Sequence, residues 1–148
     1  MPPDRIVHHE KILMITGDAE IRSELAAAKT IAVVGASPKP WRDSGSIAQF
    51  LAGKKYKVYP VNPKYKEVLG MKCYPDLLGL PETIDIVDIF RNSNKVGPIV
   101  DEAIAIGARC IWMQLGVVNE HAAAKAEAAG LTVIMDRCIA IEHRALMR

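Results

Sequence analysis

Short apolar runs alternate with longer, Ala-rich stretches along most of this chain. The apolar runs are rich in β-branched residues and predict five strands, at Thr30–Val34, Lys57–Val61, Ile84–Phe90, Arg109–Gln114 and Leu131–Asp136. The stretches between most of them have the composition and punctuation of helices. Strands that alternate with helices in this way are typical of βαβ units and of a parallel sheet.

The helix boundaries are predicted from polar residues at the starts and glycines at the ends. The expected N-caps are Ser44, Asn94 and Asn119. The expected C′ residues are Gly53, Gly107 and Gly130. We expect a leading helix over residues 18–28 and a further helix after Asp136. Residues 66–83 contain two glycines and two prolines, so this crossover is predicted to be short and irregular.

The chain is predicted to fold as one α/β domain over residues 1–148, with residues 1–17 as an N-terminal arm. A composition of 50% hydrophobic and 24% charged residues suits a globular domain with a full core. The expected architecture is a Rossmann-like open parallel sheet of about five strands in the order 3-2-1-4-5, with helices on both faces. In that order the ligand crevice lies between the first and fourth strands.

Charge and hydropathy exclude several kinds of partner. A formal net charge of +2 provides no general attraction to nucleic acid or to an anionic membrane. No apolar run is long enough for a signal peptide or a membrane span, so we expect a cytoplasmic protein. The three cysteines are widely spaced without a C-x-x-C motif, which favours reduced, buried thiols over disulfides or a metal site.

The loop after the first strand resembles only the beginning of a dinucleotide-binding fingerprint. It reads Gly35-Ala36-Ser37, and the next glycine is Gly45, so G-x-G-x-x-G is incomplete. Gly35 permits a tight turn, while the Ser37 hydroxyl and nearby N–H groups are candidates to donate to phosphate. The alternative is a simple strand-to-helix turn with Ser44 as the cap.

The region around the second strand argues against NAD. NAD sites commonly place a carboxylate about 20 residues beyond the glycine loop, but none occurs between Asp43 and Glu67. That interval instead contains five lysines, namely Lys54, Lys55, Lys57, Lys64 and Lys66. A phosphorylated ribose, as in NADP or coenzyme A, fits this charge better. Arg91 at the end of the third strand is interpreted either as a phosphate ligand or as the salt-bridge partner of a carboxylate such as Asp88.

Five motifs together resemble the small stand-alone CoA-binding proteins that are similar to the N-terminal domain of the succinyl-CoA synthetase α-subunit. The motifs are VVGAS at Val33–Ser37, PVNP at Pro60–Pro63, DIVDIFR at Asp85–Arg91, WMQLGV at Trp112–Val117 and MDRC at Met135–Cys138. The resemblance implies a Rossmann-like domain that binds coenzyme A or an acyl-CoA across the strand ends. It implies the following ligand-binding residues: Gly35, Ala36 and Ser37 near the phosphates, Asn62 and Pro63 beside the nucleotide, Phe90 and Arg91 along the cleft, and Met113 and Gln114 at the pantetheine arm. Lys64, just past Asn62-Pro63, and Arg42, in the proline-rich loop that follows Ser37, complete the candidate site.

The predicted strand ends lack a catalytic constellation. There is no histidine beside a serine or cysteine and no pair of carboxylates. His121 and His143 match no phosphohistidine motif, and Cys138 is interpreted as a structural thiol. We therefore expect a non-catalytic carrier, sensor or regulatory module for CoA, in which a homo-oligomer is compatible with the sequence. The alternatives are an NADP- or CoA-dependent enzyme completed by an oligomer partner, and a subunit that serves protein association.

Overall fold

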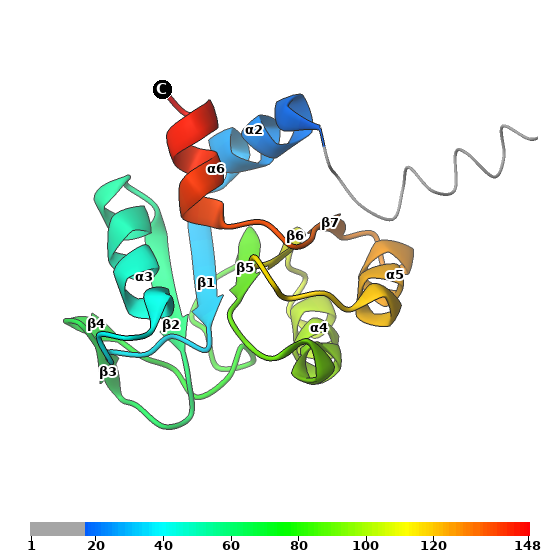
Figure 1. Cartoon of the computed structure of the whole chain (residues 1–148). Helices are drawn as coiled ribbons and strands as arrows, with labels where there is room; N and C mark the ends of the chain where they lie inside the picture. Colours follow the sequence, from blue (N-terminus) through cyan, green and yellow to red (C-terminus); the bar gives the residue numbers. More distant parts are fainter. Residues whose placement is uncertain (1–16) are drawn as a thin grey trace, which may run out of the picture.

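The computed structural model describes residues 17–148, which form a five-stranded parallel sheet with helices on both faces (Figure 1). The sheet strands are β1 (Thr30–Val34), β2 (Lys57–Val61), β5 (Ile86–Ile89), β6 (Cys110–Met113) and β7 (Thr132–Ile134). Each neighbouring pair in the sheet is parallel. The predicted α/β class and the five strand positions are confirmed, and the predicted arm lies outside the described residues except for Gly17.

Two apolar cores flank the sheet. The helices are α2 (Asp18–Ala27), α3 (Asp43–Gly53), α4 (Val96–Ala105), α5 (Glu120–Ala128) and α6 (Ile139–Leu146). Because side chains alternate along a strand, Ile31 and Val33 of β1 pack towards α2, α3 and α6, whereas Ala32 and Val34 pack towards α4 and α5. Within residues 17–148, no helix has the length and hydropathy needed to cross a membrane.

The strand order differs from the expected one. The observed order is β2-β1-β5-β6-β7, which is 2-1-3-4-5 in the numbering of the predicted strands. The third strand therefore lies beside the first instead of outside the second. The strand order reverses between β1 and β5. The ligand crevice is therefore expected between the first and third strands and not between the first and fourth.

The outer edge of β2 is occupied by the chain that follows it. The N–H of Tyr74 donates to the carbonyl of Pro60 at 2.9 Å, and the N–H of Asn62 donates to the carbonyl of Tyr74 at 2.8 Å. Pro60 has no N–H to offer a further strand at this edge, and proline is normally confined to edge strands for that reason. A third strand consequently has no place outside β2.

Polar contacts hold β5 beside β1. The Asp85 carboxylate accepts hydrogen bonds from the N–H groups of Lys29 and Thr30, at 2.7 and 3.2 Å. The Thr30 hydroxyl donates to the carbonyl of Thr83 at 2.8 Å and accepts from the N–H of Asp85 at 2.9 Å. These bonds join the starts of the two strands and specify their register.

The predicted short, irregular crossover is confirmed. It contains the antiparallel pair β3 (Glu67–Val68) and β4 (Met71–Lys72), joined by Leu69 and Gly70, which both have positive φ. The helices predicted over residues 18–28 and after Asp136 are also present, as α2 and α6.

The helix caps were predicted with mixed success. Asn119 caps α5, because its side chain accepts the N–H of Ala122 at 2.9 Å. Gly107 and Gly130 each follow a helix C-cap with positive φ, as expected. The predictions for Ser44, Asn94 and Gly53 were wrong: Ser44 lies inside the first turn of α3, Asn94 lies in the 3₁₀ turn Ser93–Lys95, and Gly53 is the last residue of α3 itself.

Candidate functional site

A cleft of about 800 Å³ opens at the carboxyl ends of β1, β2, β5 and β6. This is the usual place for a ligand in an open parallel sheet, and its volume is within the range of small-molecule sites. The predicted site residues that line it are Gly35, Ser37, Arg42, Asn62, Pro63, Lys64, Phe90, Arg91 and Gln114. The tertiary structure therefore brings together residues from four separate strand ends.

Two predicted residues do not reach the cleft. Ala36 and Met113 are both 0% exposed, and they pack into the cores on opposite faces of the sheet. Met113 is the last residue of β6, where strand alternation turns its side chain towards α4 and α5. The side chain of Gln114, one residue further on, is the one that lines the cleft.

Position 35 requires a glycine because the chain at the end of β5 lies too close for a side chain. Its φ is +90°, and a Cβ at this position would lie 2.7 Å from the carbonyl oxygen of Phe90. Its N–H donates to the carbonyl of Val61 at 2.8 Å, which ties the loop to the end of β2. The close approach that Gly35 permits is thus to β5, inside the protein.

The first loop rests on the first turn of α3. The N–H of Ser37 donates to the Ser44 hydroxyl at 3.0 Å, and both side chains are buried. A Cβ at Gly45 would overlap the carbonyl of Ser37, so this second glycine allows the helix to approach the loop. The Ser37 N–H therefore bonds within the protein and is not one of the N–H groups available to a phosphate. Its hydroxyl oxygen accepts from the N–H of Lys39 at 3.2 Å, which leaves the hydroxyl proton to donate to a ligand.

The cleft is strongly cationic around the ends of β1, β2 and β5. Its lining includes Lys39, Arg42, Lys64 and Arg91, against the single carboxylate of Asp43. Among the salt bridges found in residues 17–148, none involves any of these four cations. The N-terminus of α3 opens on the same space, and its N-cap residue Arg42 makes no side-chain capping bond. A helix N-terminus beside unpaired cations favours a phosphate-bearing ligand.

Asp88 does not pair with Arg91. Its side chain is 0% exposed in the middle of β5, and neither carboxylate oxygen has a hydrogen-bond partner in the described part of the chain. Burial raises the pKa of Asp88 well above its usual range, because an ionised carboxylate is poorly solvated there. The ion pair that was the alternative interpretation of Arg91 is therefore absent.

Two amide side chains hold the walls of the cleft in place. Asn62 donates from Nδ2 to the carbonyl of Ala36 at 2.9 Å and accepts the N–H of Lys64 at its Oδ1, also at 2.9 Å. Gln114 accepts the N–H of Ile139, the first residue of α6, at 3.0 Å. These bonds make Asn62 and Gln114 positioning residues for the loops around the cleft.

Several lining residues were not among the predicted ones. They are Lys39, Trp41, Asp43, Ser44, Ile47, Tyr65, Asn92, Leu115, Cys138 and Ile141. Trp41 is 72% exposed, with the Lys39 ammonium 5.5 Å from its ring centre, so it is not packed on the protein surface. Of the five lysines between Asp43 and Glu67, Lys64 lines the cleft and the other four do not.

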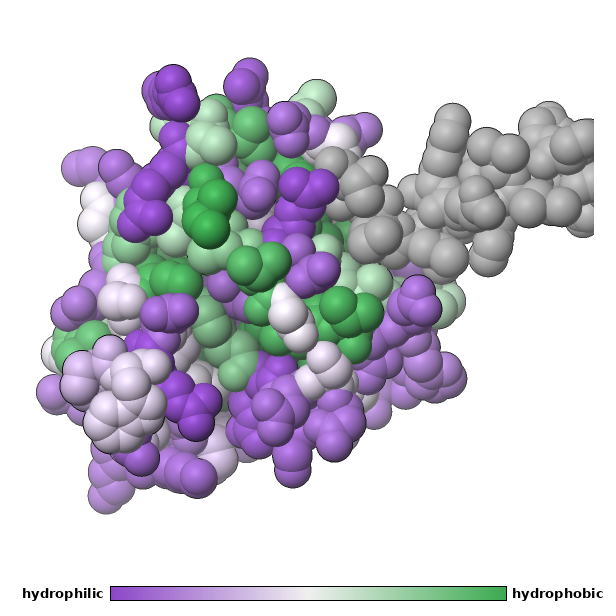
Figure 2. Space-filling model, in the orientation of Figure 1, coloured by the Kyte–Doolittle hydropathy of each residue, from purple (hydrophilic) through white to green (hydrophobic). Residues whose placement is uncertain are grey.

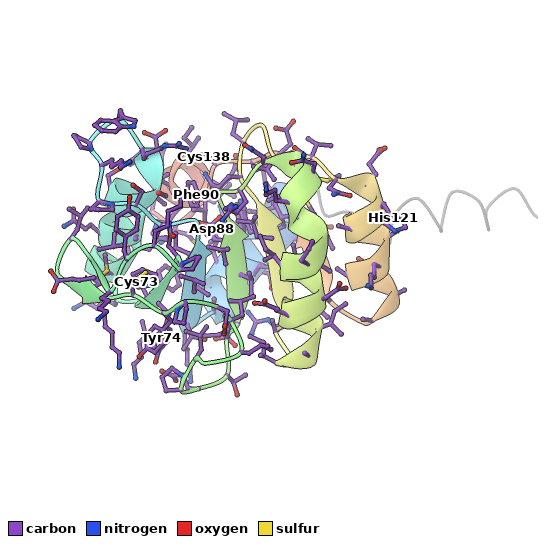
Figure 3. All side chains as sticks on the ribbon, turned by 90° about the horizontal axis from the view of Figure 1, so that it is seen from below. Cys73, Tyr74, Asp88, Phe90, His121 and Cys138 are labelled. Atoms are coloured by element: carbon purple, nitrogen blue, oxygen red, sulfur yellow. The ribbon has the colours of Figure 1, made fainter. Side chains whose placement is uncertain are left out.

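Cys138 lies at the α6 end of the cleft. It is the N-cap residue of α6 and is half-buried, whereas Cys73 and Cys110 are buried as expected. Phe90 and Cys138 both line the cleft and lie near each other in Figure 3, while His121 lies on the outer side of α5. His143 packs edge-on against Phe50 and Tyr56, in keeping with a structural role. The described residues contain no cluster of three or more His, Cys, Asp or Glu suited to a metal ion.

Comparison with known proteins supports the interpretation of the cleft. Residues 29–144 match the family described as CoA binding domain. The uncharacterized protein YneT of Bacillus subtilis is 39% identical over 125 residues, which are 84% of this chain and 93% of that protein. A hypothetical protein from Pyrococcus horikoshii has a solved structure that is 44% identical, with a TM-score of 0.87, over 90% of this chain and 94% of that one.

A further match is to part of a much longer enzyme. An ADP-forming acetate–CoA ligase of Archaeoglobus fulgidus is 40% identical over 74 residues, which are 50% of this chain and 11% of the ligase. This agrees with the resemblance seen in the five sequence motifs. The chain belongs to the CoA-binding domain family and is homologous to the CoA-binding region of ADP-forming acetyl-CoA synthetases.

Proposed function

We propose that this protein binds coenzyme A or an acyl-CoA in the cleft at the strand ends, and that it acts as a carrier, sensor or regulatory module. The observation that carries the proposal is the group of four cations without salt-bridge partners among the described residues, gathered beside the N-terminus of α3. CoA carries three phosphate groups, so it supplies the anions that such a surface favours. The family assignment supports CoA over other phosphorylated ligands.

The distribution of charge supports one direction of binding. Lys64 lies beyond the end of β2 and is suited to the phosphate on the ribose. Arg42, the Ser37 hydroxyl and the N-terminus of α3 are suited to the pyrophosphate. Arg91 and Gln114 follow β5 and β6, so the pantetheine arm extends along them towards α6.

The lining of the cleft favours binding without catalysis. Its carboxylate is Asp43, its thiol is Cys138, and within the described residues no histidine lines it. Acid–base catalysis normally needs a positioned donor and acceptor of protons near the reacting group. Purified protein should therefore not hydrolyse acetyl-CoA or succinyl-CoA faster than a protein-free control, and sustained turnover would contradict the non-catalytic role.

Isothermal titration calorimetry with four nucleotides tests the ligand. CoA should bind more tightly than dephospho-CoA because of the ribose phosphate, and NAD should bind weakly. Equal affinities for CoA and dephospho-CoA would remove the case for recognition of that phosphate. Tighter binding of NADP would favour the enzyme alternative, and absence of binding by all four would favour a role in protein association.

A matched pair of lysine variants tests the site itself. Lys64→Ala should weaken CoA binding and narrow the difference between CoA and dephospho-CoA, with an effect that shrinks as salt rises. Lys66→Ala is the control, since Lys66 is exposed two residues away and does not line the cleft. Equal losses in the two variants would point to general electrostatic attraction, and the assignment of Lys64 would fail.

A further inference from the structure

A second groove, with both hydrophobic and charged lining residues, adjoins the cleft at its α6 end. The groove has a volume of about 570 Å³ and lies between the loop after β6 and the first turn of α6. It is lined by Leu115, Val118, Met135, Asp136, Arg137, Cys138, Ile141 and Glu142. Leu115, Cys138 and Ile141 line both cavities, so the groove and the cleft adjoin one another at these three side chains.

Large hydrophobic side chains surround this groove without being buried. Leu115 is 65% exposed, Ile141 54% and Val118 43%, and these are three of the six exposed large hydrophobic residues in the described part of the chain. Figure 2 shows hydrophobic residues gathered at the centre of the face that carries α6 and the loop leading to α5. Single exposed apolar residues are common, but a contiguous group beside a cavity marks a binding surface.

The walls of the groove are held together by hydrogen bonds. The N–H of Gly116 donates to the Asp136 carboxylate at 2.7 Å, and the N–H of Arg137 donates to the carbonyl of Met113 at 3.2 Å. The Trp112 indole donates to the carbonyl of Arg137 at 2.8 Å. Together with the bond from Gln114 to α6, these contacts join the β6 loop to the chain that enters α6. The groove is therefore pre-formed, which lowers the entropic cost of binding.

The two cavities together have a polarity that matches one kind of molecule. The unbalanced cations follow β1, β2 and β5. At the α6 end the lining is mainly hydrophobic, and the charge of Arg137 there is balanced by its salt bridge to Glu142. An acyl-CoA has the same polarity, with phosphates at one end and an acyl group on the thiol at the other. We propose that the groove binds the aliphatic chain of an acyl-CoA whose nucleotide occupies the cleft. This inference rests on the proposed function and adds the class of ligand: acyl groups long enough to reach Val118 and Met135.

Titration with a series of acyl-CoAs tests the groove. Affinity should rise from CoA and acetyl-CoA through butyryl-, hexanoyl- and octanoyl-CoA, about two- to fourfold for each methylene that becomes buried. The gain should level off once the groove is full. If CoA binds but octanoyl-CoA binds no more tightly, the groove does not take an acyl chain and the apolar face serves another purpose, such as protein contact. If CoA does not bind at all, the proposed function itself fails.

Substitution of residues that line only the groove tests whether the gain in affinity with chain length arises there. Val118→Ser and Met135→Gln should weaken octanoyl-CoA binding about three- to tenfold while CoA affinity stays within twofold, because neither residue lines the cleft. Leu78→Ser is the matched control, since Leu78 is 59% exposed and lies outside both cavities. Unfolding curves of each variant establish that it is folded at the titration temperature. A chain-length gain that survives in both groove variants would place the acyl group elsewhere and overturn the inference.

Discussion

Substitution of Gly35 by alanine separates two physical effects that meet at the end of β1. The residue has φ of +90°, and an added Cβ would lie 2.7 Å from the Phe90 carbonyl oxygen and 3.0 Å from Cδ of Arg91. A left-handed backbone costs an L-residue about 1–2 kcal/mol. Forcing an extra carbon into a packed position costs about 1–3 kcal/mol more. Gly35→Ala should therefore lower the free energy of unfolding by about 2–5 kcal/mol.

Two further glycines provide controls, one for the backbone cost alone and one for a position with neither cost. Gly107 has φ of +73° with open space around an added Cβ, so Gly107→Ala should carry the backbone cost alone, about 1–2 kcal/mol. Gly53 is the last residue of α3, with no neighbour within 4 Å of an added Cβ and no left-handed φ. Gly53→Ala should stabilise the protein by about 0.5–1 kcal/mol, because alanine loses less entropy in a helix.

Urea unfolding followed by circular dichroism measures all three variants. For a chain of this size, 1 kcal/mol corresponds to a shift in Tm of about 2–4 °C, so the series is resolved by thermal unfolding as well. The expected ranking of stability is Gly53→Ala, then wild type, then Gly107→Ala, then Gly35→Ala. If Gly35→Ala were no less stable than Gly107→Ala, the contact with β5 would carry no cost, and the structural explanation of this glycine would be wrong.

Three other substitutions have distinct expected outcomes. Burial raises the pKa of Asp88, so the folded protein keeps a proton that the unfolded chain releases above about pH 4, and the free energy of unfolding falls as pH rises from there through the folded pKa. Urea unfolding at increasing pH should therefore show Asp88→Asn becoming more stable relative to wild type. A difference between the two proteins that does not depend on pH would contradict this. Ser44→Ala removes the acceptor of the buried Ser37 N–H, which should lower the free energy of unfolding by about 1–3 kcal/mol, measured by thermal unfolding. Unlike the loss of a simple cap, it should also weaken CoA binding, measured by calorimetry. Asn119→Ala removes both the cap of α5 and the hydrogen bond to the Ser93 carbonyl, which together should cost about 1–3 kcal/mol in thermal unfolding. CoA affinity should be unchanged, since Asn119 lines neither cavity, and a loss of affinity would connect α5 to the site.

Local patterns were sufficient to predict the strands, most helices and nine of the nineteen residues that line the cleft. A buried parallel strand is a short apolar run whatever its partners are, so its position is encoded within a few residues. The same holds for the residues that end each strand, because the carboxyl ends of parallel strands meet at one edge of the sheet. Gly35, Asn62, Arg91 and Gln114 were placed together on that basis, and all four line the cleft.

One residue of the sequence, Pro60, carries part of the information about the strand order. Pro60 in the second strand indicates an edge strand, which is incompatible with the order 3-2-1-4-5 because that order makes the second strand interior. The position of the third strand beside the first depends on contacts of Asp85 with Lys29 and Thr30, which are 55 or more residues away. No periodicity in the sequence reports such a pairing.

The remaining properties of the site depend on residues that are distant in sequence. Cys138 and Ile141 line the cleft because the first turn of α6 packs against Gln114, 25 residues before Ile139. Whether Arg91 is paired or free depends on the direction of the Asp88 side chain, and strand alternation buries that side chain in the core. The chemistry of each residue is local and can be identified from the sequence. Its neighbours, exposure and charge balance are products of long-range packing, which a single sequence records only indirectly.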